Sequence, residues 1–193
     1  MKITLFFLAI LMFTLSSCST KNKSVAGTGK QFNAKNPFEI YLTTLEQIPL
    51  PFKYNPLGKL PELSKNYDKK AFEKYSYFGT SKPLGVLFND SKTVTIVDCS
   101  IGDNGLVPFL TTYDKKGNKI DSLAPFQKSG GDIGYFAIEY LTITKDKNVV
   151  VLDSITTYKL KSDNSDVDES TKKITTGLIK YTIAENGQIK NKH

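Results

Sequence analysis

The sequence has no arginine and no tryptophan, and its single histidine is the last residue, His193. A serine or cysteine nucleophile usually works with a nearby base, so the lack of a well-placed imidazole argues against nucleophilic catalysis. Histidine-based metal sites are excluded for the same reason, and the two cysteines, Cys18 and Cys99, are too few for a zinc site. We therefore expect no resident metal and no cofactor.

The absence of arginine also affects how the formal net charge of +7 is interpreted, because all 26 basic residues are lysines. Residues 18–82 hold eleven lysines against five acidic residues, whereas residues 83–193 hold fourteen of each. Residues 83–193 carry no net charge, and the chain has no arginine, whose guanidinium group binds phosphates with two hydrogen bonds. Both facts argue against a nucleic-acid partner. A lysine excess confined to the N-terminal part instead favours contact with an anionic lipid surface.

The N-terminal segment has the plan of a secretory signal peptide. Lys2 precedes an apolar run from Ile3 to Leu15, which is shorter than the ~20 residues that a membrane-spanning helix needs. The following Leu15-Ser16-Ser17-Cys18 resembles the lipobox of bacterial lipoproteins, which ends in an invariant cysteine. The resemblance implies cleavage before Cys18, a diacylglyceryl thioether on its sulfur and an acyl chain such as palmitate on its amino group. The alternative is an ordinary signal peptide that leaves Cys18 as a free thiol.

The lipobox resemblance divides the chain into a signal peptide at 1–17, a lipidated flexible tether at 18–35 and a single β-rich domain at 36–193. By resemblance to the sorting pattern of Gram-negative lipoproteins, Ser19 after the cysteine favours the outer over the inner membrane. Some surface-exported lipoproteins carry acidic residues after the cysteine, and lysines stand there instead. We therefore expect the periplasmic face rather than the cell surface. If Cys18 is acylated, Cys99 has no disulfide partner, and we expect it to be a small buried side chain.

The domain opens with helix signals. Asn36-Pro37-Phe38-Glu39 places a capping residue, a proline and a glutamate where helix starts prefer them. Apolar residues at helical spacing then predict a helix that ends near Gln47. Ile48 to Phe52 contains two prolines and predicts an extended segment packed on the body. Residues 68–77 are a candidate for a second short helix.

The remainder of the chain predicts strands separated by turns, with an antiparallel pair joined at Asp146–Asn148. Apolar residues at both odd and even positions of 135–141 indicate that both faces of that strand are at least partly covered. The predicted fold is mainly β: an antiparallel meander of about 7–8 strands forming a curved sheet, sandwich or half-barrel, with one N-terminal helix. The expected strands are 84–88, 93–97, 106–113, 119–123, 133–144, 149–160, 173–183 and 188–190.

Two acidic features are candidate sites. Glu139 and Asp153 lie on neighbouring predicted strands and could meet as a catalytic carboxylate pair, although solvent-facing positions balanced by lysines are the favoured interpretation. The loop from Asp163 to Glu169 offers oxygen ligands for calcium. It lacks the glycine and the final glutamate of an EF-hand, so a solvated hairpin loop is favoured there.

Four tyrosines on the long predicted strands are candidate ligand-binding residues, because tyrosine is enriched where a protein surface meets a partner. The lack of tryptophan weakens the case for a sugar ligand. The alternative is that the rings cap the edge of the core. The four are Tyr135, Tyr140, Tyr158 and Tyr181.

These observations favour a non-enzymatic, membrane-anchored envelope lipoprotein that binds a macromolecular partner as an inhibitor, an immunity protein or an accessory subunit. A small-ligand or glycan-binding lipoprotein is the alternative. A carboxylate-based hydrolase is the third hypothesis, disfavoured by the sparse inventory of acids and bases. The expected partners are the membrane, through Cys18, and an envelope protein.

Overall fold

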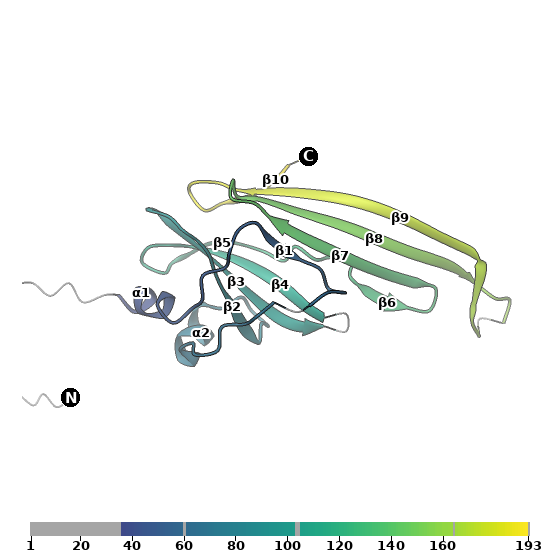
Figure 1. Ribbon diagram of the computed structural model, residues 1–193, viewed down its shortest axis with the longest axis horizontal. Helices are drawn as coiled ribbons and strands as arrows, with labels where there is room; N and C mark the ends of the chain where they lie inside the picture. Colours follow the sequence, from purple (N-terminus) through teal and green to yellow (C-terminus); the bar gives the residue numbers. More distant parts are fainter. Residues whose placement is uncertain (1–35, 60, 103–104, 164, 193) are drawn as a thin grey trace, which may run out of the picture. The chain divides into compact units, whose positions relative to one another are not determined.

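The computed structural model describes residues 36–59, 61–102, 105–163 and 165–192, which belong to one compact unit, Ala34–His193. The predicted signal peptide, tether and Cys18 lie outside these residues. The described part is mainly β, with antiparallel sheets and few helices, which confirms the predicted fold class (Figure 1). It contains ten strands, because two three-residue strands add to the expected set. None of its helices has the length and apolar character needed to cross a membrane.

One sheet has six strands and contains the longest strands of the described chain. Its order is β1-β7-β8-β9-β10, and β6 pairs with the same strand, β7, as β1 does. The tight turn at Asp146–Asn148 joins β7 and β8 as an antiparallel pair, as predicted. The strands are β1 (Phe52–Tyr54), β6 (Gly130–Asp132), β7 (Tyr135–Ile143), β8 (Asn148–Leu160), β9 (Val167–Ile183) and β10 (Ile189–Lys192).

The second sheet is a four-stranded antiparallel meander in which each strand pairs with the next. Its inner face shares one hydrophobic core with the six-stranded sheet, where Leu110 and Val97 of one sheet join Leu141 and Val149 of the other. Cys99 is buried in this core, as predicted, and burial raises the pKa of its thiol to about 11. The strands are β2 (Lys82–Asn89), β3 (Thr93–Gly102), β4 (Gly105–Asp114) and β5 (Lys119–Leu123).

Two short helices, α1 (Pro37–Leu42) and α2 (Lys69–Tyr75), pack on the other face of the four-stranded sheet. Asn36 and Glu39 form the predicted capping box at the start of α1. The predicted end near Gln47 is wrong, because α1 stops at Leu42. The hydroxyls of Thr43 and Thr44 donate to carbonyls one turn back, which offers the backbone an alternative to a continued helix.

The segment after α1 is extended and packs on the body, as predicted. The Ile48 amide donates to the Val86 carbonyl at 2.8 Å, and the Val86 amide donates to the Glu46 carbonyl at 2.8 Å. Gly85 permits this approach, because a Cβ there would lie 2.3 Å from the Glu46 carbonyl oxygen. Ile48 and Phe52 are consequently buried in the shared core.

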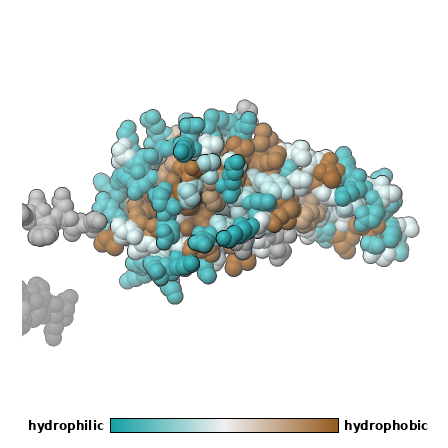
Figure 2. All heavy atoms as spheres, viewed as in Figure 1, coloured by the Kyte–Doolittle hydropathy of each residue, from teal (hydrophilic) through white to brown (hydrophobic). Residues whose placement is uncertain are grey.

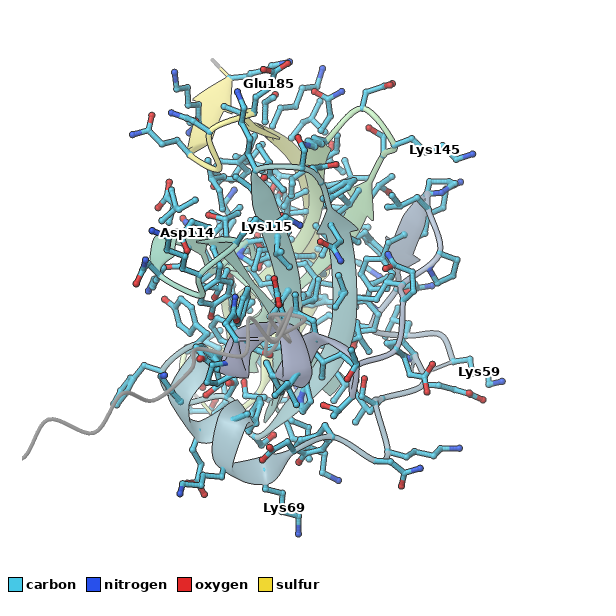
Figure 3. All side chains as sticks on the ribbon, turned by 90° about the vertical axis from the view of Figure 1, so that its left-hand side faces the viewer. Lys59, Lys69, Asp114, Lys115, Lys145 and Glu185 are labelled. Carbon is cyan, nitrogen blue, oxygen red and sulfur yellow. The ribbon has the colours of Figure 1, made fainter. Side chains whose placement is uncertain are left out.

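Charged side chains lie at the periphery of the described unit. Lys59, Lys69, Lys145 and Glu185 point outward into solvent (Figure 3). They come from loops, turns and the start of α2. The lysine-rich composition is therefore carried by the surface, while the acidic side chains that are buried are few and have specific partners.

Candidate functional site

Glu139 of β7 pairs directly with Asp153 of β8, so the two carboxylates lie side by side on the same face of the six-stranded sheet. Their places on neighbouring predicted strands allowed this contact. The favoured interpretation of them as solvent-facing is wrong, because they are 0% and 2% exposed. The reason is the segment Gln127–Ser129, which folds over the inner face of the sheet at this point. The sequence gives no signal for this loop position.

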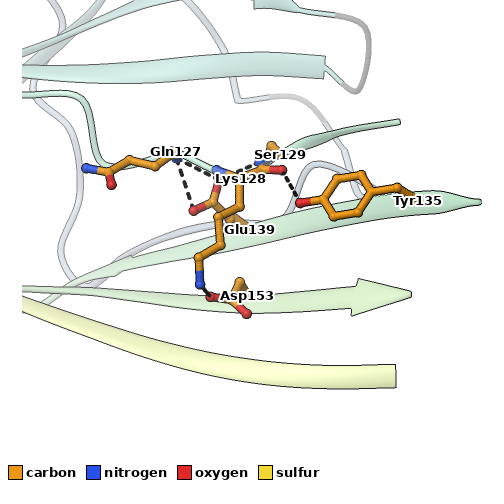
Figure 4. A network of polar contacts seen from close by, with 6 residues as sticks. All are labelled: Gln127, Lys128, Ser129, Tyr135, Glu139 and Asp153. Carbon is orange, nitrogen blue, oxygen red and sulfur yellow. Dashed lines mark hydrogen bonds and ion pairs between the residues drawn. The ribbon is translucent and has the colours of Figure 1, made fainter. Parts of the chain in front are cut away.

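The carboxylate of Glu139 accepts hydrogen bonds from three backbone N–H groups of this loop (Figure 4). The amides of Gln127, Lys128 and Ser129 donate to its Oε2 at 2.9, 2.8 and 2.8 Å. The Tyr135 hydroxyl donates to the Lys128 carbonyl at 3.1 Å, which adds a fourth tie. A carboxylate is the natural acceptor for several converging N–H groups, because it is negative and has two acceptor oxygens.

Asp153 is neutralised from the same loop. The Lys128 ammonium lies 2.5 Å from its Oδ2, and this hydrogen bond raises the pKa of Lys128. On the other side, Gly177 of β9 leaves room for the carboxylate, because a Cβ there would lie 2.5 Å from the same oxygen. The two acids therefore hold the loop on the sheet. They face protein groups rather than a cleft in which a substrate could reach them.

The four candidate tyrosines do not converge on one face. Tyr135 and Tyr181 occupy inward positions of the six-stranded sheet, and Tyr181 is buried in the shared core. Tyr140 occupies an outward position, and Tyr158 lies at an irregularity of the register between β8 and β9. The Lys172 ammonium lies 6.0 Å from the centre of the Tyr158 ring.

The outward side of the six-stranded sheet is an exposed apolar surface, which we call the outer face. Leu152 of β8 pairs directly with Leu178 of β9, and the two side chains are 45% and 55% exposed. Both faces of residues 135–141 are at least partly covered, as predicted, because Ile138 at an outward position is buried like Ala137 and Glu139 at inward ones. Leu152 and Leu178 lie on the neighbouring strands, and α1 packs on the other sheet. Figure 2 shows hydrophobic side chains exposed among hydrophilic ones over the long strands. The outer face contains Phe136, Tyr140, Val150, Leu152, Ile174 and Leu178.

The charged groups of the outer face are all basic. Lys53 of β1, Lys180 of β9, and Lys190 and Lys192 of β10 take outward positions and are exposed. Within the register-paired parts of the described strands, no aspartate or glutamate takes an outward position. Sequence analysis missed this surface, although its apolar residues occupy even-numbered positions of β7, β8 and β9. The alternation of a strand does not reveal which of its two faces the other sheet covers.

The acidic loop between β8 and β9 uses its carboxylates locally. Asp163 accepts from Ser165, Asp166 pairs with Lys161 at 2.9 Å, and Asp168 accepts from Ser170. Each of these contacts lowers the pKa of its aspartate. No cluster of three or more potential metal-ligating side chains occurs in the described ranges.

A second buried polar group lies in the core beneath the helices. Asp98 of β3 is 0% exposed, and its Oδ2 accepts from the Tyr77 amide at 2.8 Å. Its Oδ1 and the buried hydroxyl of Tyr41 have no hydrogen-bond partner among the described residues. Burial raises the pKa of Asp98 to about 7.

Comparisons of this chain with protein-family models, with curated proteins and with solved structures found no match. The functional assignment therefore rests on the chemistry of the chain itself. The enclosed carboxylates anchor a loop, whereas apolar side chains of the outer face are exposed.

Proposed function

We propose that this chain is a lipid-anchored lipoprotein of the Gram-negative envelope whose β domain binds a protein partner without catalysing a reaction. The outer face carries this proposal, because exposed apolar side chains lie there side by side on three adjacent strands. Contiguous exposed apolar surface is typical of interaction sites. The surrounding lysines add a charge that a partner with acidic groups would complement.

The anchor in this proposal is Cys18, on the strength of the lipobox resemblance of Leu15-Ser16-Ser17-Cys18. One buried lipid chain holds a protein only marginally, whereas two or more give stable attachment. Ser19 supports the outer membrane, and the lysines that follow support its periplasmic face. An inhibitor, an immunity protein and an accessory subunit of an envelope assembly all meet this description.

The two other hypotheses receive less support. A ligand pocket built from the candidate tyrosines needs them on one face, and they divide between two. A carboxylate hydrolase needs both acids in a cleft, and Glu139 and Asp153 are enclosed by the loop Gln127–Ser129. An open sheet surface fits a macromolecule better than a small molecule, because small ligands bind in concave sites.

The test is in-cell crosslinking of the tagged, full-length protein, followed by detergent extraction and mass spectrometry. We expect one protein to be captured at near-equal stoichiometry. The double variant Leu152→Ser, Leu178→Ser should reduce that capture about tenfold or more, because it removes the centre of the outer face. Both side chains are about half exposed, so the fold should tolerate the change.

The matched control is Phe78→Ser, which removes an apolar side chain that is 96% exposed and lies after α2, on no part of the outer face. It should leave capture unchanged. Capture of no protein would contradict the proposal. If the control and the double variant capture the partner equally well, the outer face is not where the partner binds.

A further inference from the structure

The long strand β9 has a free edge. On one side it pairs with β8 along most of its length, from Val167 to Thr182. On the other side β10 covers only Lys180–Ile183. Between 173 and 179 the backbone of this edge therefore meets no other strand of the described chain (Figure 1). Unpaired N–H and C=O groups along a strand edge are a template for another strand.

The side chains at this edge define what could pair with it. Ile174 and Leu178 project onto the outer face and are more than half exposed. Lys172 and Lys173 stand at one end of the open edge and Lys180 at the other, and all three are exposed. No acidic residue occurs from 170 to 183. The edge thus combines open backbone groups, apolar side chains on one face and positive charge at both ends.

These features discriminate between three occupants. A lipid surface would suit the apolar and basic side chains, but its hydrocarbon offers no partners for the strand's backbone N–H and C=O groups. A second copy of the chain would bring the three lysines of each β9 close to the three of the other, with no acid from 170 to 183 to offset them. An extended segment of another protein satisfies the backbone and can supply acidic side chains.

We propose that an extended, acidic segment of a partner protein adds as a strand to β9 along residues 173–179. Its apolar side chains at alternate positions lie beside Ile174 and Leu178 and continue the outer face. Its acidic side chains lie near Lys172 and Lys173, which reject basic strands and thereby select the partner. This inference rests on the proposed function and specifies how the partner is bound.

The test places the photo-crosslinking residue p-benzoylphenylalanine singly at Ile174, Thr176 and Leu178 of the full-length protein in its cells. Successive outward positions of a strand are two residues apart. Strand addition therefore predicts that the three crosslinks fall on one partner peptide, at sites that advance by two residues in one direction. The same residue at Leu152 reports whether any protein contacts the outer face.

A charge variant tests the chemistry of the partner segment. Lys172→Glu, Lys173→Glu should lower the crosslink yield at Thr176 about tenfold, because it places acidic groups against an acidic strand. The matched control, Lys69→Glu, Lys70→Glu, makes the same change in net charge at exposed positions of α2 and should leave the yield unchanged. Both pairs are exposed, so folding is not at issue. Equal yields would overturn the acidic character of the segment.

The other outcomes are equally decisive. Crosslinks to lipid, to a second copy of this chain, or to scattered sites of a partner would overturn strand addition. Capture of a protein from Leu152 without the two-residue progression would leave the proposed function standing and reject the inference. Capture of no protein from any of these positions would reject both.

Discussion

At the scale of single residues, Asp98 is a carboxyl that the fold holds out of water. Burial raises its pKa from 3.8 to about 7, and among the residues that the structure describes only one of its oxygens has a donor, the Tyr77 amide. The folded protein therefore keeps a proton that the unfolded chain releases above about pH 4. The stability that this group contributes is present below pH 4 and is lost as the pH rises through about 7.

Asp98→Asn should remove this pH dependence. The asparagine oxygen can still accept from the Tyr77 amide, but the side chain carries no charge at any pH. We expect the free energy of unfolding of the variant, relative to that of wild type, to be higher by about 3 kcal/mol at pH 8 than at pH 5, because only the wild type loses stability over this range. Urea denaturation at the two pH values measures the difference.

The control for this prediction is Asp132→Asn, which changes an exposed aspartate of β6 in the same way. It should shift the unfolding free energy by a similar small amount at both pH values. A relative stability of Asp98→Asn that does not grow between pH 5 and pH 8 would show that Asp98 is not the group responsible.

At the scale of elements, the loop Gln127–Ser129 is held by a carboxylate rather than by a strand ladder. Glu139 accepts from three consecutive backbone amides, and Asp153 neutralises the loop's lysine, Lys128. The loop links the end of β5 to β6, so it ties the two sheets together. The buried acids are best explained as the anchor of this crossing.

Glu139→Gln should loosen that anchor. A glutamine offers one acceptor oxygen in place of two, and its side-chain NH₂ group would face backbone N–H groups of the loop, which are also donors. We expect the free energy of unfolding to fall by about 2 kcal/mol, the scale of hydrogen bonds to a charged acceptor. Hydrogen exchange at the amides of Gln127, Lys128 and Ser129 should accelerate more than at the amides of β3.

The exposed Glu169→Gln, in β9, is the matched control for this change. It should alter neither the unfolding free energy nor exchange in the loop. Unchanged exchange at Gln127–Ser129 in Glu139→Gln would show that other contacts hold the loop.

The sequence was sufficient for elements whose signals are local. The capping box at Asn36 and the hairpin at Asp146–Asn148 were predicted, because caps and turns depend on neighbouring residues. The strand β1 was missed, because its partner in β7 lies about ninety residues later in the chain. The strand β6 was missed although it pairs with the next strand, β7, because Gly130-Gly131 gives no strand signal. The end of α1 was also missed, and the segment that follows it bonds to Val86.

The candidate site was predictable only in part, for the same reason. The register that places Glu139 beside Asp153 followed from two adjacent strands. Their burial depends on a loop from outside the pair, and no period in the sequence reports it. The apolar residues of the outer face can be found from the alternation of the strands, but the alternation does not show that this face is left uncovered by the rest of the chain.

At the scale of the whole molecule, the proposed lipid anchor governs where the domain can act. Cys18→Ala removes the sulfur to which the lipid would attach, so it should leave uncleaved precursor in the membrane or a mislocalised protein. Fractionation and the apparent mass of the chain measure both effects. Unchanged processing and membrane retention would contradict the lipoprotein assignment.

The pairing of β1 has a consequence for the order of folding. Phe52 to Tyr54 pair with Leu141 to Ile143, about ninety residues later in the chain. The strands β2 to β5 join neighbours by short turns and are complete by Leu123, so they can form before the rest of the domain. Until β7 has emerged, their apolar inner face has no opposing sheet and is prone to aggregation. Closing the shared core is therefore a late, non-local step, and the apolar inner face of β2 to β5 stays exposed until it occurs.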